Sequence, residues 1–160
     1  MTQSKSEESE RLSPEKELAI FGRWPAWFNM KGDFRLSGMS DGFRCCDGWY
    51  DIVLHLCERL EPLVANLDDS GEEFQVLQVK EKFGELRFYV NRRTDEIREA
   101  IRSACQLSWR TCELCGKDAG SFAQRGKLRR PAANGLFNTL CSSCGESTHS
   151  ASERSRQFKR

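Results

Sequence analysis

The strongest periodic pattern in the chain runs from Trp49 to Leu67 and predicts an amphipathic helix. At 100° per residue, the apolar side chains of this segment fall within one stripe and the polar ones fall opposite it. The stripe consists of Trp49, Val53, Leu56, Cys57, Leu60, Leu63, Val64 and Leu67. We expect Asp47 to be the N-cap of this helix. Pro62, on the polar side, should bend or restart it, because proline cannot donate to the carbonyl of Glu58.

A β-hairpin is predicted by the pattern that follows this helix. Residues 74–80 and 85–90 are rich in β-branched and aromatic side chains, and the short segment between them ends in Gly84. Leu86, Phe88 and Val90 alternate with polar residues in the second run. We therefore expect these three side chains to line one face of the second strand.

Two further helices are predicted, one on each side of these elements. Residues 14–21 begin with a proline, which suits a first helical turn, and the aromatic cluster at 24–28 is interpreted as core packing. Thr94 or Asp95 is expected to cap a later helix that runs to about Trp109. The apolar side of that helix consists of Ile97, Ala100, Ile101, Ala104 and Cys105.

Two short cysteine pairs in the last third of the chain predict a metal site. Cys112 and Cys115 form one Cys-x-x-Cys pair, Cys141 and Cys144 form another, and 25 residues separate the pairs. A two-residue gap lets both sulfurs of a pair face one ion, and two such pairs complete the tetrahedral four-thiolate site typical of zinc. Each pair is followed by a glycine, which can adopt the positive φ that a tight turn under a metal needs. We predict one zinc ion bound by these four cysteines.

The elements and the cysteines together predict the fold class. We expect a small α+β protein, with a helix-plus-hairpin body at residues 15–109 and a zinc-ribbon-like module at residues 110–145. Within the module, residues 136–140 are expected to form a strand that leads into the second cysteine pair. The polar residues 1–14 and the basic residues 146–160 are expected to be disordered tails.

Other interpretations of the cysteines stay open at this point. The four could be unrelated buried or disulfide-bonded residues, and His149 could replace Cys144 as the fourth ligand. Cys57 lies on the apolar stripe, which favours a place in the core. A second metal site is the alternative for four residues outside the two pairs, namely Cys45, Cys46, His55 and Cys57.

Charge is distributed unevenly along the chain. Residues 109–160 contain ten Lys or Arg and four Asp or Glu, a net charge of +6, so the first 108 residues carry −5 within a total of +1. A cluster between the cysteine pairs consists of Arg125, Lys127, Arg129 and Arg130. This split predicts a basic module for an anionic partner, joined to an acidic body, with a solvated basic tail as the alternative.

The compartment is predicted by the cysteines and by the absence of sorting signals. No segment of the sequence approaches the ~20 apolar residues needed to cross a membrane. The polar, acidic start of the chain is unlike a secretory signal. Eight cysteines without an export signal indicate a reducing cytoplasm, where thiols bind metal instead of forming disulfides.

Three stretches of the chain, taken in order, resemble a family of small, mostly uncharacterised proteins encoded by tailed bacteriophages and prophages. They are residues 42–49 (Gly-Phe-Arg-Cys-Cys-Asp-Gly-Trp), residues 78–89 (Gln-Val-Lys-Glu-Lys-Phe-Gly-Glu-Leu-Arg-Phe-Tyr) and the two cysteine pairs. The resemblance covers roughly residues 40–145, and its most specific part is 78–89. Cys46 departs from the pattern, as does the Ser/Arg-rich extension after Cys144. The resemblance implies a phage protein of the host bacterial cytoplasm with a metal site, and it implies no activity.

The sequence favours binding over catalysis. It has no His-Glu-x-x-His motif, no phosphate-binding glycine loop and no paired histidines near a carboxylate, and four thiolates leave no open position on a zinc ion. We expect a non-catalytic accessory protein whose cluster at 125–130 contacts nucleic acid through phosphates. That segment lacks aromatic residues interleaved with basic ones, which argues against single strands. The alternative is a factor that binds and modulates a host or defence protein through the charged hairpin tip at 80–83.

Overall fold

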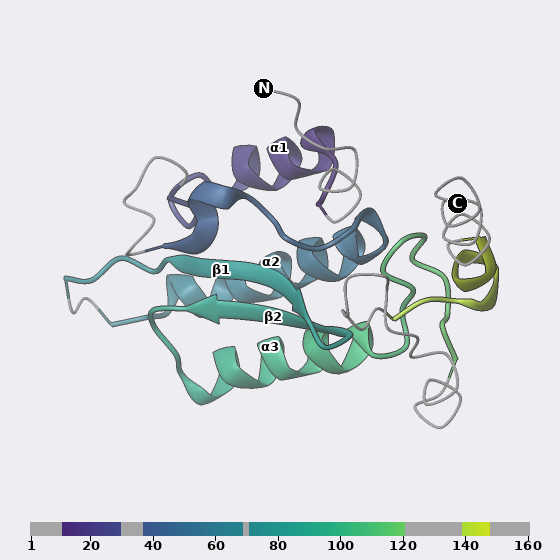
Figure 1. The fold of residues 1–160 in the computed structure, drawn as a ribbon. Coiled ribbons are helices and arrows are strands. Elements are labelled where there is room, and N and C mark those ends of the chain that lie inside the picture. The colour runs from purple at the N-terminus through teal and green to yellow at the C-terminus, as the bar shows by residue number, and fades with distance from the viewer. Residues whose placement is uncertain (1–10, 30–36, 69–70, 121–138, 148–160) are drawn as a thin grey trace.

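The computed structural model describes residues 11–29, 37–68, 71–120 and 139–147 of the chain. Within these residues the fold is α+β, as predicted, with helices arranged around one antiparallel hairpin (Figure 1). The order of elements is α1 (Pro14–Arg23), η2 (Gly38–Asp41), η3 (Asp47–Trp49), α2 (Tyr50–Ala65), β1 (Val76–Lys82), β2 (Glu85–Val90) and α3 (Asp95–Ser108). Residues 142–147 are also helical. The two predicted tails lie mostly outside the described residues, so the proposed division of the chain stays a prediction.

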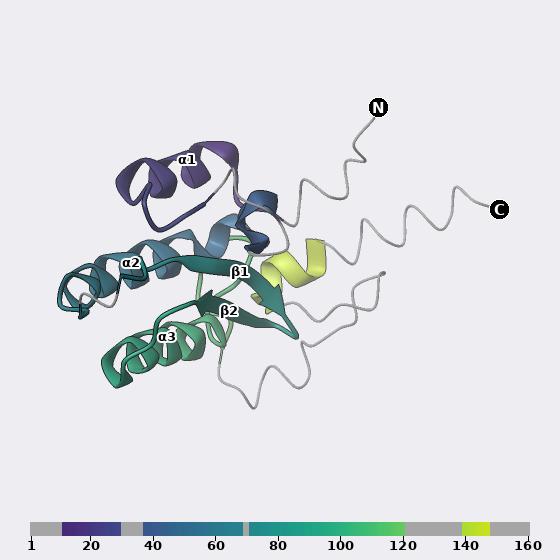
Figure 2. The same cartoon turned by 90° about the vertical axis from the view of Figure 1, so that its left-hand side faces the viewer.

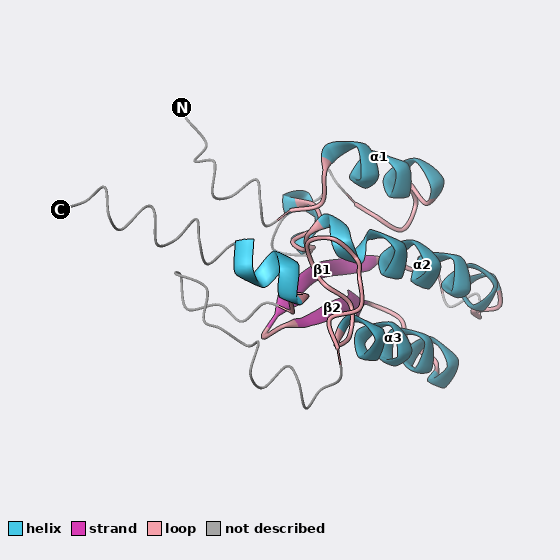
Figure 3. Ribbon diagram, turned by 90° about the vertical axis from the view of Figure 1, so that its right-hand side faces the viewer, coloured by secondary structure: helices cyan, strands magenta, loops and turns pink. Residues whose placement is uncertain are grey.

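The helices form a layer on one face of the hairpin. Figures 2 and 3 show α2 and α3 side by side against the two strands, with α1 on the other side of α2. The predicted stripe of α2 is confirmed, because its residues from Trp49 to Leu60 are buried and the later ones pack partly buried against the same core. The hairpin contributes Val76, Val79, Leu86, Phe88 and Val90 to that core, and α3 contributes Ile97, Ala100 and Ala104.

The aromatic cluster after α1 belongs to this core, as predicted. Trp24, Trp27 and Phe28 are buried, and the Trp27 ring packs edge-on against Phe74 at 5.2 Å between centroids. The backbone of Trp27 also accepts a hydrogen bond of 2.8 Å from the amide of Val76, at the start of β1. The N-terminal helix is thereby attached to the edge of the hairpin.

The start of α2 differs from the prediction. Asp47 does not cap α2, which begins at Tyr50 after the short helix η3. Its carboxylate instead accepts a hydrogen bond of 2.7 Å from the backbone of Ser13 and pairs with Lys16 at 3.3 Å. The predicted restart at Pro62 is also wrong, because α2 continues through this exposed residue to Ala65.

The hairpin closes with a tighter turn than the sequence suggested. Strand β1 extends to Lys82, which pairs with Glu85, so only Phe83 and Gly84 form the loop. Both have positive φ, 57° and 76°, which is the signature of a type I′ turn. On the side of β1 away from β2, the backbone of Arg44 forms hydrogen bonds with the backbones of Val79 and Glu81. This short parallel bridge widens the sheet beyond the two strands.

Helix α3 covers the outer edge of β2. Its N-cap is Thr94, whose hydroxyl accepts a hydrogen bond from the amide of Ile97, as predicted. Near its other end, the hydroxyl of Ser108 accepts a buried hydrogen bond of 2.9 Å from the amide of Leu86. Of the helices that the structure describes, none combines the length and the apolar character that a membrane crossing requires.

Candidate metal centre

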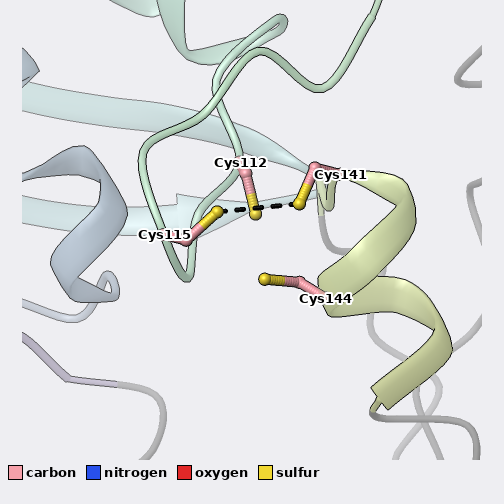
Figure 4. A group of neighbouring side chains, drawn as sticks. All are labelled: Cys112, Cys115, Cys141 and Cys144. Carbon is pink, nitrogen blue, oxygen red and sulfur yellow. Dashed lines mark hydrogen bonds between the residues drawn. The ribbon is translucent and has the colours of Figure 1, made fainter.

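The four predicted cysteine ligands come together in space. The sulfurs of Cys112, Cys115, Cys141 and Cys144 all lie within 4.8 Å of one another and point toward one centre (Figure 4). Sulfurs placed tetrahedrally at about 2.3 Å from a zinc ion are about 3.8 Å apart. The Cys115 and Cys141 sulfurs are 3.6 Å apart, which fits this value and exceeds the ~2.05 Å of a disulfide. The cluster therefore has the donor atoms and the spacing of a four-thiolate metal site.

The first cysteine pair sits on a tight turn directly after α3. The amide of Cys112 donates to the carbonyl of Lys117 at 2.7 Å, and the amide of Gly116 donates to the carbonyl of Cys112 at 2.9 Å. Gly116 has a φ of 75°, so the prediction that a glycine turns the chain under the metal is confirmed for this pair. The site directly follows α3, since three residues separate Ser108 from Cys112.

The second pair is held differently, at the beginning of a helix. Cys141 directly precedes the helical residues 142–147, and its carbonyl accepts a hydrogen bond of 2.9 Å from the amide of Gly145. Gly145 lies inside this helix, so it does not supply a positive φ, contrary to the prediction. Residues 139 and 140 are not in a strand, and the rest of the predicted strand, 136–138, lies outside the described residues.

Three of the four thiols in the cluster have shifted pKa values. The backbone amide of Cys144 lowers the pKa of the Cys141 thiol to about 7, against the opposing effect of burial. Burial raises the pKa of Cys112, and burial together with the thiols of Cys115 and Cys141 raises that of Cys144. One thiol is thus ready to ionise, while further thiolates are disfavoured beside it unless a positive charge is bound. A divalent metal ion supplies that charge and deprotonates coordinating thiols.

The centre is fastened to the body at two places that the sequence analysis missed. At the first, the amide of Gly48 donates to the carbonyl of Glu113 at 2.7 Å, and the indole of Trp49 donates to the carbonyl of Thr111 at 2.9 Å. A side chain at Gly48 would overlap the backbone of Cys112 and Glu113, so the close approach requires glycine here. In the sequence, Gly48 belongs to the stretch 42–49 named above, but no spacing pattern links this stretch to Glu113.

The second fastening point is the turn of the hairpin. The buried hydroxyl of Thr139 donates to the carbonyl of Gly84 at 2.7 Å. The carbonyl of Thr139 accepts a hydrogen bond of 2.8 Å from the amide of Glu113, so the two halves of the centre are also joined by their backbones. No sequence pattern marked Thr139, because its partner is 55 residues away.

The remaining predicted site residues lie elsewhere or outside the described residues. Among the described residues, Cys45, Cys46, His55 and Cys57 do not form a second metal-binding group. Cys45 and Cys57 are buried in the core, where burial raises the pKa of both thiols, and His55 is exposed. The alternative ligand His149 and the basic cluster Arg125, Lys127, Arg129 and Arg130 fall outside the described residues.

No family model, curated protein or solved structure matches the chain. Four protein thiolates satisfy the coordination of a zinc ion, which is typical of structural sites, whereas catalytic sites keep a position for water or substrate. The chemistry that the centre can perform is therefore to join distant segments of the chain.

Proposed function

We propose that this protein is a non-catalytic, zinc-binding accessory protein that holds a basic segment against its α+β body for contact with nucleic acid. The observation that carries the proposal is the four-sulfur cluster, which joins Cys112 and Cys115 to Cys141 and Cys144. A metal ion bound there fixes both ends of the 25-residue segment between the pairs. The resemblance to phage and prophage proteins supports a role in the cytoplasm of an infected bacterium.

The charge of the joined segment supports an anionic partner. Between Asp118 and Glu146 the sequence contains the basic cluster at 125–130 and no acidic residue. Lysine and arginine side chains bind nucleic acid mainly by neutralising phosphates and releasing counterions, independently of base sequence. Anchoring both ends of a segment of this composition limits how far its positive charge can lie from the body.

The proposal is tested first by metal content and then by nucleic-acid binding. We expect one zinc per chain in protein purified without added metal, and less than about 0.3 would reject the metal centre. We expect R125A/K127A/R129A/R130A to weaken DNA and RNA binding about equally for unrelated sequences. The slope of log affinity against log salt should also fall by close to one unit per lost phosphate contact.

A matched control removes the same charge from the body. Arg59, Arg93, Arg98 and Arg102 are exposed on or beside the helices, away from the metal centre. The variant R59A/R93A/R98A/R102A should keep most of the affinity if the segment is the contact. No binding by the wild-type protein at about 50 mM salt would reject the nucleic-acid role.

A second candidate function is the binding of a host or defence protein through the hairpin tip. The observation that favours it is Phe83, an aromatic side chain that is 60% exposed beside Lys82. Capture of a bacterial protein that survives nuclease treatment and is lost with K80A/K82A/F83A would support this role over the first.

A further inference from the structure

The two faces of the hairpin have different characters. Leu86, Phe88 and Val90 are buried in the core that the hairpin shares with α2 and α3. Because side chains alternate along a strand, the residues between them face the other way. The pairing of the strands places Lys80 opposite Arg87, and Gln78 opposite Tyr89, on this outer face. These four residues are partly exposed.

Basic and aromatic groups are interleaved on the outer face. The Lys80 ammonium lies 5.9 Å from the centre of the Tyr89 ring, and the Lys82 ammonium lies 5.4 Å from the centre of the Phe83 ring. Arg87 adds a third positive charge, which pairs with Glu85 at 2.9 Å. The sequence between the cysteine pairs lacked such interleaving, and here the register of the two strands creates it.

The turn residue Phe83 is unusual for its position. A type I′ turn needs positive φ at both central residues, and Asn-Gly is the preferred pair there. Phe83 holds a φ of 57° with a bulky side chain, a conformation that disfavours any residue with a large Cβ substituent. Its ring is 60% exposed, so packing in the core does not account for it. Strained residues of this kind concentrate at functional sites.

The hairpin turn also contacts the C-terminal end of the segment between the cysteine pairs. Thr139 is the next-to-last residue of the segment between the cysteine pairs, and its hydroxyl donates a hydrogen bond of 2.7 Å to the carbonyl of Gly84. The end of the basic segment is therefore fixed beside Phe83. This contact joins the turn that carries Phe83 to the segment between the cysteine pairs.

We propose that the outer face of the hairpin binds single-stranded nucleic acid, with bases stacked on Phe83 and Tyr89 and phosphates bound by Lys80, Lys82 and Arg87. This inference rests on the proposed function and names the form of nucleic acid. Unpaired bases can stack on exposed aromatic rings, whereas the bases of a duplex are already stacked on one another. DNA and RNA single strands share this chemistry.

The first test asks how much the positive charges on this face contribute to oligonucleotide binding. Fluorescence anisotropy of labelled 20-nucleotide oligo(dT) and oligo(U), and of a 20-base-pair duplex, is recorded with the full-length, zinc-loaded protein. We expect K80Q/K82Q to weaken single-strand binding about tenfold and to lower the salt slope by about 1.4 units, since each contact contributes about 0.7. The control R98Q/R102Q removes the same charge from α3 and should stay within about twofold of wild type.

The second test separates the ring from the stability of the turn. Asparagine adopts positive φ readily, so F83N should leave the hairpin at least as stable as in the wild type. Loss of a stacking ring weakens binding by roughly 5- to 100-fold for one base. We therefore expect F83N to have an equal or higher melting temperature together with this loss of affinity, a combination that misfolding cannot produce.

The remaining outcomes distinguish this inference from the function on which it rests. Wild-type protein that binds no oligonucleotide rejects both. Binding that prefers the duplex, or that is unchanged in K80Q/K82Q and F83N but lost in R125A/K127A/R129A/R130A, overturns the inference and leaves the proposed function standing. Displacement of the oligonucleotide by polyglutamate at equal charge, with F83N unaffected, would assign the face to an acidic protein instead.

Discussion

The body and the metal centre keep their shapes by different means. In the body, large side chains such as Phe43, Trp49 and Leu60 are fully buried in one cluster. Burial of each such side chain contributes roughly 1.5–3 kcal/mol. Among the described residues of the centre, the buried apolar side chains are Cys112, Ala119 and Cys141, with a few partly buried neighbours. Apolar burial among these described residues is small, so we expect the centre to depend on a bound metal ion for its stability.

The comparison shows that the two regions are attached by a narrow contact. Gly48 and Trp49 meet the first cysteine pair from the start of α2, and Gly84 meets Thr139 at the hairpin turn. These are hydrogen bonds to backbone carbonyls, and apolar packing contributes little to them. Each region should therefore be perturbable while the other persists, and the following predictions test that independence.

The largest effect is expected from removal of the metal. Structural zinc contributes about 10–16 kcal/mol of apparent binding energy that is also folding energy. Chelation, or the substitution C141S, should make residues 110–145 sensitive to limited proteolysis and leave residues 45–105 protected, as mapped by mass spectrometry. The control C105S changes a cysteine outside the cluster and should keep its zinc. Simultaneous cleavage of both regions would show that they are one unit.

A cavity in the body should have the opposite selectivity. Leu60 is fully buried in α2, and truncating such a residue to alanine costs about 2–5 kcal/mol. We expect L60A to lower the free energy of unfolding by this amount, measured from urea denaturation followed by tryptophan fluorescence. The folded variant should retain one zinc per chain. Loss of zinc from L60A under native conditions would mean that the centre cannot form on a weakened body.

A smaller effect is expected at the contact between the two regions. A methyl group at Gly48 would overlap the backbone of Cys112 and Glu113, so G48A should destabilise the protein by about 1–3 kcal/mol and weaken zinc binding. Gly22 provides the matched control, because it lies in α1 with open space around it. G22A should raise stability by roughly 0.5–1 kcal/mol, since alanine is the better helix former. Equal behaviour of the two variants in thermal melts would refute the close contact.

The smallest effect concerns pH and a contact confined to the body. Partial burial raises the pKa of Asp47, but the hydrogen bond from the Ser13 amide and the charge of Lys16 outweigh it, so the pKa lies below its usual value. A lowered pKa stabilises the fold above the unfolded value near 3.9 and loses this contribution as pH falls through the folded pKa. The melting temperature of D47N should therefore be below that of wild type at pH 6. The difference should shrink below about pH 4, with zinc-independent unfolding of the body as the signal.

The sequence predicted those features whose cause is local. The stripe from Trp49 to Leu60, the alternation of Leu86, Phe88 and Val90, and the Thr94 cap each follow from spacing within one element. The four cysteines of the cluster could be predicted equally well, because metal coordination fixes the spacing within each pair. In these cases one short segment contains the whole signal.

The features that escaped prediction depend on partners far along the chain. Asp47 looks like an N-cap, but Ser13 and Lys16, more than thirty residues earlier, occupy its carboxylate. Gly48 looks like a turn residue, and its role becomes visible only when Glu113 lies against it. The end of β1 was predicted two residues too early, at Lys80 instead of Lys82, because a phenylalanine at positive φ is not a turn signal that composition reveals.

The joining of the two cysteine pairs has a consequence for how this chain can change. With Cys115 and Cys141 held on one ion, the residues between them form a closed loop, and Gly116 and Thr139 near its two ends add contacts that depend on their own identity. The entropy of closing a loop grows only slowly, by about 0.6 kcal/mol for each doubling of its length. Insertions, deletions or an exchanged sequence between Gly120 and Thr139 should therefore be tolerated by the fold, provided that Gly116 and Thr139 are kept. The same body and metal centre could therefore carry different binding segments between the cysteine pairs.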